Sequence, residues 1–244
     1  MTSTSATEQK LRKDAAANRE RLLTAGRELF ARRGLGVTLN DVAHHAGVGV
    51  GTAYRRFSNK EELIDAILER QNEEIEQILH AALAEPDPWT GLVLYLERSL
   101  ALQAQDRGMA QIFAGKHGRR TKYDESRDRL APLINRVAER ARDAGALRAD
   151  ATGTDLVFLQ IALSTVAAVT QDGASLEGRE GAEQLYRRYL RIALDGLRAD
   201  GPTSQLPIPA LTTAQTHTLL QPTRPEQDVI LADAADDDDM ESTS

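Results

Sequence analysis

Residues 38–64 read TLNDVAHHAGVGVGTAYRRFSNKEELI, a pattern that predicts two short helices in front of a longer one. Thr38 and Asp41 have the spacing of a capping box. In this motif the threonine hydroxyl accepts a hydrogen bond from the third helical amide, and the carboxylate accepts one from the backbone amide of the threonine. A helix should therefore begin at Leu39. Gly47 follows within about two turns and readily takes the positive φ of a tight turn, so we expect this helix to be short.

Two more helices are expected after this turn. The first runs from about Val50 to Phe57, and the second begins after Asn59, a good helix cap with Glu62 at the reciprocal position. Apolar side chains recur every three or four residues along the second of these helices, at Leu63, Ile64, Ile67, Ile75, Ile78, Leu79 and Leu83. Because this helix ends only before Pro86, it spans roughly 36 Å and is long enough to join two bodies rigidly.

The chain upstream of residue 38 divides into an arm and a helix. Residues 1–17 begin with a Ser/Thr-rich stretch that lacks periodicity. We expect a flexible basic arm there, whose Lys10, Arg12 and Lys13 can reach phosphate or a minor groove. An amphipathic helix should cover residues 18–33 and stop at Gly34. Its apolar or small positions are Leu22, Gly26, Leu29 and Phe30.

The rest of the chain predicts an all-α protein. Only 4% of residues are aromatic while 41% are hydrophobic, which suits packed helices rich in Leu and Ala. Helical patterns occur near residues 89–105, 108–114, 125–144, 154–171 and 179–199, and no strand pattern appears. From Gly201 onward, prolines and a final acidic block predict a disordered acidic tail over 201–244, with a transient helix at Leu211–Leu220.

Charge is segregated along the chain. Residues 10–60 hold eleven Lys and Arg against four Asp and Glu, a net charge of +7, whereas residues 61–244 hold nineteen against thirty-two, or −13. A basic N-terminal module can face phosphates while the acidic remainder limits unspecific adhesion. This distribution favours a nucleic-acid partner for the N-terminal region.

Several function classes are excluded or disfavoured by the sequence. The chain has no Cys, which removes disulfides and thiolate metal sites, and we expect no cofactor and no metal. His44 and His45 are adjacent and diverge by about 100° on a helix, so they cannot comfortably share an ion. No nucleophile elbow, phosphate loop or zinc-protease spacing occurs, so an enzyme is not expected. Without a signal peptide or a run of about 18 apolar residues, a cytoplasmic protein with no membrane partner is expected.

The segment 38–64 resembles the DNA-binding signature of the tetracycline-repressor (TetR) family of transcriptional regulators. The matching positions are Val42, Ala43, Ala46, Gly47, Val48, Gly51, Thr52, Ala53, Tyr54, Phe57, Lys60 and Leu63. This density of matches over about 25 residues is specific, whereas a lone A-x-x-G-V would be weak. Three helices with a Gly-containing turn between the second and third also fit a helix-turn-helix on physical grounds.

Roles for individual residues follow from this reading. Val42, Ala43, Ala46, Val48, Phe57 and Leu63 should form the core of the module. The residues expected to contact DNA are Thr38, Gly49, Val50, Gly51, Thr52, Tyr54, Arg55, Arg56 and Lys60. The resemblance implies phosphate contacts for Tyr54, Lys60 and Thr38. Many family members open the recognition helix with Ser or Thr, but this chain has Gly49 and Gly51 around Val50, which leaves a weaker cap and no hydroxyl for phosphate there.

The resemblance further implies a helical bundle over residues 65–200 that dimerises and binds a small molecule, behind a DNA-binding domain over 18–64. The nearly continuous apolar run 156–169 and the stripe on the last helix fit a homodimer interface. Candidate pocket residues are Trp89, Tyr95, Met109, Phe113, Phe158 and Gln160, although core packing alone accounts for most of them.

The sequence is thus interpreted as a TetR-like regulator, and as a repressor in the usual case, that binds a near-palindromic DNA operator as a homodimer and is released by a small-molecule effector. The alternative is a ligand-independent DNA-binding dimer that is controlled by a protein partner, through the acidic tail 201–244.

Overall fold

A computed structural model describes residues 3–104, 120–171, 181, 184–201 and 204–220. Every regular element of these residues is a helix, and the single β-bridge joins Leu147 to Arg198. The all-α prediction is therefore confirmed. The helix expected at 108–114 lies outside the described residues.

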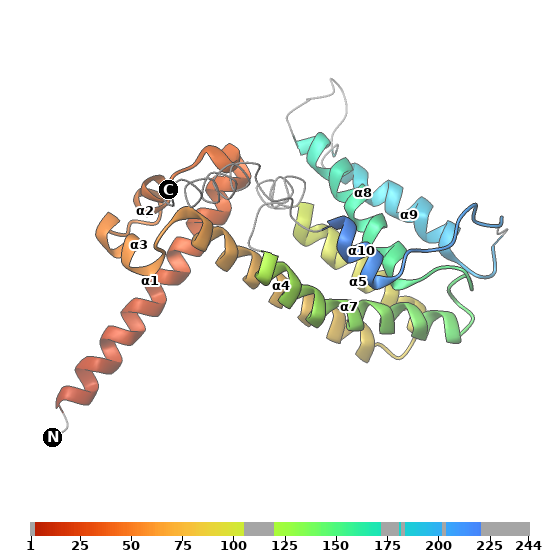
Figure 1. Cartoon of the computed structure of the whole chain (residues 1–244), viewed down its shortest axis with the longest axis horizontal. Coiled ribbons are helices and arrows are strands. Elements are labelled where there is room, and N and C mark those ends of the chain that lie inside the picture. The colour runs from red at the N-terminus through yellow and green to blue at the C-terminus, as the bar shows by residue number, and fades with distance from the viewer. Residues whose placement is uncertain (1–2, 105–119, 172–180, 182–183, 202–203, 221–244) are drawn as a thin grey trace, which may run out of the picture.

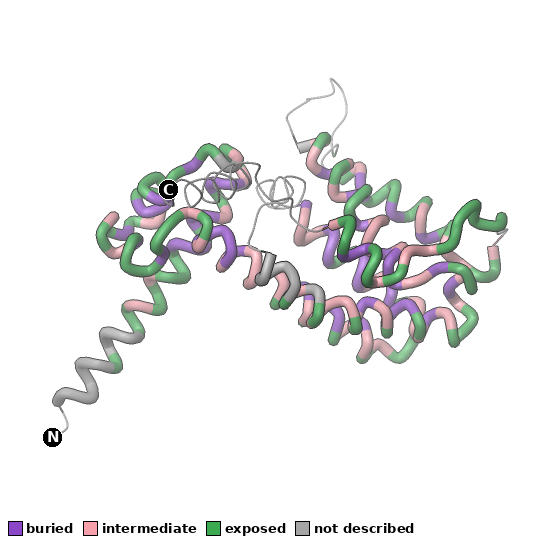
Figure 2. The backbone as a smooth tube through the Cα atoms, viewed as in Figure 1, coloured by how far each residue is buried: buried purple, intermediate pink, exposed green. Residues whose placement is uncertain are grey.

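The N-terminal domain is a group of helices around one small core, from which the first part of its first helix projects (Figures 1 and 2). Its elements are α1 (Ser3–Arg33), the short 3-10 helix η1 (Gly34–Gly36), α2 (Leu39–His45) and α3 (Val50–Arg56). Leu22, Phe30, Val42, Ala43, Ala53, Phe57 and Leu63 are each at most 2% exposed in this core. Gly26 lets α1 approach α4 (Lys60–Ala84) closely, since a Cβ there would lie 2.9 Å from Cδ1 of Ile67. Gly34 ends α1 with a φ of 67°, as its position in the sequence predicted.

The expectation of a flexible arm over residues 1–17 is wrong for residues 3–17, which form the first half of α1 (Figure 1). This half carries no apolar stripe that periodicity can detect. Three consecutive alanines at 15–17 have the highest helix propensity of any residue and favour continuing the helix toward the N-terminus. The basic residues ahead of residue 18 therefore lie on a helix.

Helix α4 (Lys60–Ala84) joins the N-terminal domain to the C-terminal body, as predicted (Figure 1). Oδ1 of Asn59 accepts a hydrogen bond from the amide of Glu62 at 2.8 Å and caps the helix. The Glu62 carboxylate accepts from the amide of Ser58 at 2.6 Å, one residue upstream of the cap. Side chains at both ends of α4 are buried, so each end is fixed in a different core.

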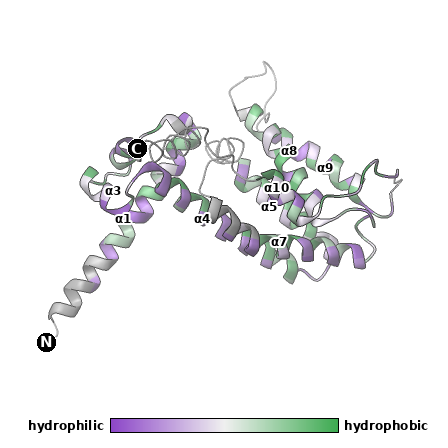
Figure 3. Ribbon diagram, in the orientation of Figure 1, coloured by the Kyte–Doolittle hydropathy of each residue, from purple (hydrophilic) through white to green (hydrophobic). Residues whose placement is uncertain are grey.

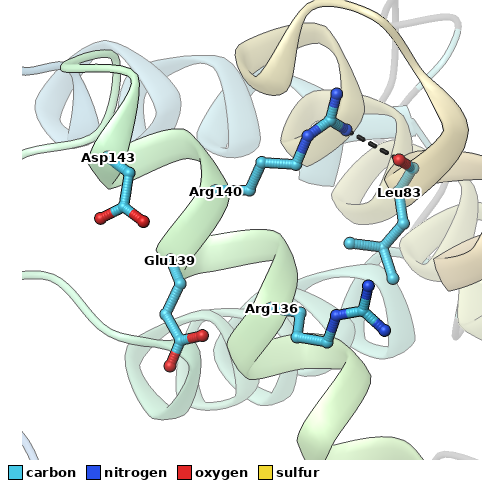
Figure 4. Close-up of a pocket in the computed structure, with 5 residues that line it drawn as sticks. All are labelled: Leu83, Arg136, Glu139, Arg140 and Asp143. Atoms are coloured by element: carbon cyan, nitrogen blue, oxygen red, sulfur yellow. Dashed lines mark hydrogen bonds between the residues drawn. The ribbon is translucent and has the colours of Figure 1, made fainter.

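The far end of α4 is held by Arg140 of α7 (Arg120–Asp143). The Arg140 guanidinium donates to the carbonyl oxygen of Leu83 at 2.9 Å (Figure 4) and to that of Glu85 at 2.6 Å. Carbonyls at the end of a helix lack partners within the helix. A surface hollow of about 400 Å³ lies here, lined by Leu83, Arg136, Glu139, Arg140 and Asp143. Because its arginine already caps α4, we assign this hollow a structural role.

The C-terminal body packs α5 (Pro88–Ala104), α7, α8 (Gly153–Gln171) and α9 (Leu185–Leu197) around a second core. Two glycines permit close helix contacts. A Cβ at Gly91 would lie 2.3 Å from the carbonyl oxygen of Ala82, and one at Gly153 would lie 2.3 Å from Oδ1 of Asn135. Large apolar side chains that are at most 1% exposed complete this core at Leu79, Leu92, Tyr95, Leu96, Leu100, Leu147 and Leu156.

The segment 204–220, expected to belong to a disordered tail, is packed onto the body, which corrects that expectation. It ends in α10 (Thr213–Leu220), close to the helix expected at 211–220. The Thr154 hydroxyl donates to the carbonyl of Leu211 at 2.7 Å, and Thr216 and His217 are buried. Residues 221–244 lie outside the described part of the chain.

Helix α8 corrects a second expectation, that no stretch reaches the length and apolarity of a membrane span. Residues Gly153–Thr170 have a mean hydropathy of 1.5 over 18 residues, and 33% of them are buried (Figure 3). This helix packs against α5, α7 and α9, so part of its apolar surface belongs to the core of the body. The remaining apolar surface of α8 points away from that core.

Candidate nucleic-acid interface

The start of α2 is fixed by the capping box that the sequence predicted. The Asp41 amide donates to Oγ1 of Thr38 at 3.2 Å, while the Thr38 amide donates to Oδ2 of Asp41 at 2.8 Å. The Thr38 hydroxyl also donates to Oδ2 of Asp41 at 2.6 Å. These hydrogen bonds from Thr38 lower the pKa of Asp41 below its ordinary value of 3.8. Thr38 is thereby held, exposed, at the N-terminus of a helix, where a phosphate is favoured.

The turn between α2 and α3 brings the two helices into contact. Gly47 has a φ of 61°, a conformation that glycine adopts without strain. The Val48 amide donates to the carbonyl of Ala43 at 3.0 Å and closes the turn. Val42, Ala43 and Ala53 are fully buried between the helices, whereas Ala46 is half-buried. The small side chains thus set the close packing expected of a helix-turn-helix.

Helix α3 presents an exposed, basic outer face. Tyr54 is 49% exposed, and Arg55 and Arg56 are exposed beside it. Nη2 of Arg55 donates to Oγ1 of Thr52 at 2.9 Å, which positions the guanidinium along the helix. These side chains combine hydrogen-bond donors and positive charge, the chemistry that reads base edges and holds phosphates.

Gly49 is the N-cap of α3 and makes no side-chain cap, as its lack of a side chain dictates. Its carbonyl accepts from the amides of Thr52 at 2.8 Å and Ala53 at 3.0 Å, so the first turn forms on backbone hydrogen bonds alone. Gly49 and Gly51 are exposed, and a Cβ at Gly51 would meet nothing within 4 Å. The backbone at this end of the helix is therefore exposed and not covered by side chains, so a partner can approach it closely.

The structure brings the predicted DNA-contacting residues together on the N-terminal ends of α2 and α4 and on α3. Thr38, Gly49, Gly51, Tyr54, Arg55 and Arg56 are exposed, whereas Val50, Thr52 and Lys60 are half-buried. Lys60 is the first residue of α4, directly after the Asn59 cap.

Contacts behind this surface were not anticipated by the sequence reasoning. Nε2 of His45 lies 2.9 Å from Oε2 of Glu28 on α1, and the Arg19 guanidinium lies 5.7 Å from the Phe57 ring centroid. His45 therefore ties α2 to α1. Among the residues that the structure describes, no group of three or more His, Asp or Glu side chains is placed to hold a metal ion.

The pocket residues expected in the body are only partly brought together. Burial raises the pKa of the Tyr95 hydroxyl well above its ordinary value, and the nearby Gln160 side chain opposes part of this rise. Phe158 is half-buried on α8. Trp89 lies instead on the first turn of α5, with the Arg198 guanidinium 4.9 Å from its ring centroid. Met109 and Phe113 lie outside the described residues.

Three polar residues of α4 and α5 were missed, of which Ser99 and Gln71 are buried and Gln103 is half-buried. Nε2 of Gln103 donates to Oε1 of Gln160 at 3.3 Å, and Ser99 is fully buried one turn before Gln103 on α5. Gln71 on α4 is 2% exposed. Its position was visible in the sequence as the polar member of the four-residue series 67, 71, 75, 79, whose other members are apolar.

Comparison with known families gives two matches that together cover most of the chain. Residues 22–67 match the family described as bacterial regulatory proteins, tetR family. Residues 87–199 match the C-terminal domain described as transcriptional regulator SbtR-like. The division between these matches falls within α4 and the turn that follows it.

Curated relatives carry regulator names. The chain is 31% identical over 137 residues to the HTH-type transcriptional repressor BepR of Brucella suis, an alignment that covers 55% of this chain and 64% of that protein. It is 31% identical over 114 residues to the HTH-type transcriptional regulator TtgR of Pseudomonas putida, covering 44% and 54%. The chain thus spans less than two thirds of the length of these relatives.

Solved structures resemble the chain over their whole length. A TetR transcriptional regulator from Streptomyces coelicolor is 27% identical with a TM-score of 0.55, covering 76% of this chain and 99% of that one. A TetR transcription regulatory protein from Mycobacterium vanbaalenii is 27% identical with a TM-score of 0.56, covering 77% and 99%.

Proposed function

The chain belongs to the TetR family of transcriptional regulators, and from that premise we propose that it is a repressor that binds a near-palindromic operator as a homodimer and leaves it when a small molecule binds. Its family and its curated relatives are regulators of transcription, so the chain is a DNA-binding regulator and not an enzyme.

The observation that carries the proposal is the exposed basic face of α3. Tyr54, Arg55 and Arg56 project from a short helix that is anchored from behind by the buried Ala53. A recognition helix of this kind enters the major groove, while the N-termini of the flanking helices approach phosphates. Thr38 and Lys60 stand at those two N-termini.

A homodimer is supported by apolar side chains that α8 and α9 leave uncovered. Ile161 and Val169 on α8 are 41% and 65% exposed, and Tyr189 and Ile192 on α9 are 44% and 55% exposed. The opposite face of α9 is buried in the body through Tyr186, Leu190 and Leu194. Two helices from each of two copies would form a four-helix interface that buries these residues. The same surface explains why α8 is apolar beyond what its own core requires.

Two-fold symmetry of such a dimer places two copies of α3 about one DNA turn apart or a multiple of it. A near-palindromic operator is the matching DNA sequence. Ligand control then needs only an effector that binds more tightly to the conformer whose recognition helices are wrongly spaced. Helix α4 is the element that can transmit this difference, because its two ends lie in different cores. We place the regulator in the cytoplasm, where its DNA is.

The test is titration of a fluorescent promoter fragment from the chain's own genomic neighbourhood, at two salt concentrations. We expect tight binding that weakens steeply with salt, because counterions are released from the DNA. Tyr54→Ala should weaken binding at least ten-fold, and Arg136→Ala, on the exposed face of α7, should not. Absence of binding to every fragment at low salt by a folded protein would refute the proposal.

The dimer has its own test. Ile161→Asp combined with Ile192→Asp should convert the protein to a monomer on light scattering, since an unpaired charge in an apolar interface is unfavourable. Leu219→Asp changes an apolar side chain on α10 that is 56% exposed, and it should leave the mass unchanged.

A further inference from the structure

We propose that the effector of this regulator is an uncharged molecule that carries hydrogen-bonding oxygen or nitrogen groups on an apolar skeleton, bound between α4, α5 and α8. This inference rests on the proposed ligand control and names the chemical class of the ligand. The residues that carry it are Gln71, Ser99, Gln103 and Gln160, which we call the amide cluster.

The amide cluster contains buried polar atoms without a hydrogen-bond partner. These atoms are Nε2 and Oε1 of Gln71, Oγ of Ser99 and Nε2 of Gln160. Their side chains lie in residues that are 2%, 0% and 7% exposed. Buried polar groups in folded proteins are almost always paired, because an unpaired one forfeits its hydrogen bonds to water. Four such atoms in one region indicate that a bound molecule supplies the missing partners.

Three members of the cluster are placed side by side by direct contacts and helical spacing. Oε1 of Gln160 on α8 accepts a hydrogen bond from Gln103 of α5, and the Gln160 side chain lies close enough to Tyr95 of α5 to affect its pKa. Tyr95, Ser99 and Gln103 are spaced four residues apart, so they form one stripe along the same face of α5. Ser99 therefore lies between the two side chains that reach Gln160.

The register of α4 against α5 brings Gln71 to the same level. The two helices run antiparallel, and Gly91 meets Ala82 at the turn end of the pair. The same number of residues separates Gln71 from Ala82 as separates Leu102 from Gly91. Because both helices rise equally per residue, Gln71 lies level with Leu102 along the pair. It also shares one stripe of α4 with Ile75 and Leu79, which pack in the core of the body. The cluster thus spans all three helices.

Charged side chains of α4 in this region are engaged elsewhere. Glu69 and Glu76 lie 2.8 Å and 3.1 Å from Arg129 of α7. Glu74 lies 3.5 Å from Arg27 of α1, and Arg70 contacts Glu20 of α1. The unpartnered buried atoms of the amide cluster belong to neutral amides and a hydroxyl, whereas Nη2 of Arg129, which also lacks a partner, belongs to a guanidinium that is already paired with Glu69 and Glu76. Within the described residues, the cluster therefore offers no countercharge to a carboxylate or an ammonium group.

The cluster also defines what the ligand must present. The two Nε2 groups are hydrogen-bond donors and require acceptors, whereas Oε1 of Gln71 is an acceptor and requires a donor. The Ser99 hydroxyl can pair with a donor or with an acceptor. A carbonyl or hydroxyl compound meets these needs. Apolar neighbours such as Ile75, Leu96 and Leu163 belong to the surrounding core and suit an apolar skeleton.

The experiment uses the full chain without DNA and a fragment set that holds equal numbers of neutral, anionic and cationic compounds of matched size, observed by saturation-transfer NMR at pH 7. We expect neutral carbonyl and hydroxyl fragments to bind. Gln71→Leu should weaken their binding at least ten-fold without lowering Tm, because it removes polar atoms that have no partner in the free protein. Gln77→Leu, on the exposed side of α4, is the matched control and should change binding less than two-fold.

Two more variants sharpen the result. Gln71→Glu should shift the preference toward cationic fragments, because it adds a buried carboxylate. Ser99→Ala removes only a hydroxyl. If Gln71→Leu disturbs the packing of the core, Ser99→Ala provides the same test with a smaller change, and it should also weaken the binding of neutral fragments. Preferential binding of charged fragments to the unaltered protein, or the absence of any signal that depends on Gln71 or Ser99, would overturn the inference and leave only ordered water as the partner of these atoms. Operator titration of the same variants reports separately on DNA binding, so failure of one proposal is distinguishable from failure of the other.

Discussion

Arg129 of α7 donates a hydrogen bond from Nη1 to Oε1 of Glu69 on α4, at 2.8 Å. Its Nε lies 3.1 Å from Oε2 of Glu76, so one guanidinium joins two carboxylates that are seven positions apart on the same helix. The hydrogen bond with Glu69 and the nearby carboxylates raise the pKa of Arg129. Helix α7 of the C-terminal body therefore contacts α4 at two positions, Glu69 and Glu76. Helix α1 contacts α4 through the ion pair of Arg27 and Glu74.

Arg129→Met should lower the free energy of unfolding by about 1 kcal/mol, the upper range for a partly exposed ion pair. The reason is that Glu69 and Glu76 lose their common partner and repel each other. Urea denaturation at low salt and in 1 M NaCl checks this, since screening should shrink the difference. Arg136→Met on the exposed face of α7 is the control. A loss that is equally large in 1 M NaCl would contradict the electrostatic explanation.

Gly91→Ala should destabilise the protein by about 1–3 kcal/mol, because the new methyl group would meet the backbone carbonyl of Ala82, which cannot move without shifting α4. The distance from an ideal Cβ to that oxygen is 2.3 Å. Differential scanning calorimetry should show a lower Tm. Gly196→Ala in α9 is the matched control, since a Cβ there meets nothing within 4 Å. Helix propensity alone should make the control neutral or up to about 1 kcal/mol more stable.

The capping box makes stability depend on pH. Because the pKa of Asp41 is lowered in the folded state by hydrogen bonds from Thr38, its contribution to stability is present above the unfolded pKa and is lost as pH falls through the folded pKa. Asp41→Asn should therefore be less stable than the unaltered protein at pH 6, and the two curves should converge below pH values of about 3.8. Thermal melts from pH 6 to pH 2.5 measure the difference. A gap that stays constant over this range would rule out the charge of Asp41 as its cause.

The pair Thr52 and Arg55 should act on DNA as a unit. The threonine hydroxyl accepts from the guanidinium at 2.9 Å, which holds the arginine for base recognition. We expect Arg55→Ala to cost about 1–3 kcal/mol on the operator and less on scrambled DNA. Thr52→Val should weaken operator binding in the unaltered background but add little to Arg55→Ala. Fluorescence anisotropy on a double-mutant cycle tests this, and strict additivity would show that the two residues act independently.

The sequence predicted the elements whose signals are local. Thr38 with Asp41 and Asn59 with Glu62 marked the starts of α2 and α4, and Gly47 marked the turn, because caps and positive φ angles depend on a few neighbouring residues. The start of α1 was missed because residues 3–17 have helix propensity but no apolar stripe, and only a stripe gives a periodic pattern that can be recognised in the sequence. The amide cluster was also missed, since whether Gln71 is paired depends on helices distant in sequence.

The segment after residue 200 shows the same limit. Its prolines suggested disorder, but Arg148 donates to the carbonyl of Ser204 at 2.7 Å and Asn135 donates to Thr213 at 3.2 Å. Deleting residues 204–244 should therefore lower Tm, because Thr216 and His217 leave a buried position. Deleting only 221–244 should lower Tm less, since the hydrogen bonds of Ser204, Leu211 and Thr213 to the body are retained. Melting curves of the two truncations test this directly.

The shorter truncation should also change DNA binding. Residues 221–244 hold eight Asp and Glu against one Arg, a net charge of −7 that repels DNA. Without them, affinity for non-specific DNA at low salt should rise several-fold, and the rise should vanish at high salt, because the effect is long-range and screened. Replacing Asp236, Asp237, Asp238 and Asp239 by Asn keeps the length and should reproduce most of the gain. If both variants bind DNA as the full chain does but no longer respond to their control signal in the cell, the acidic segment contacts a protein partner, and the alternative of partner control gains its support.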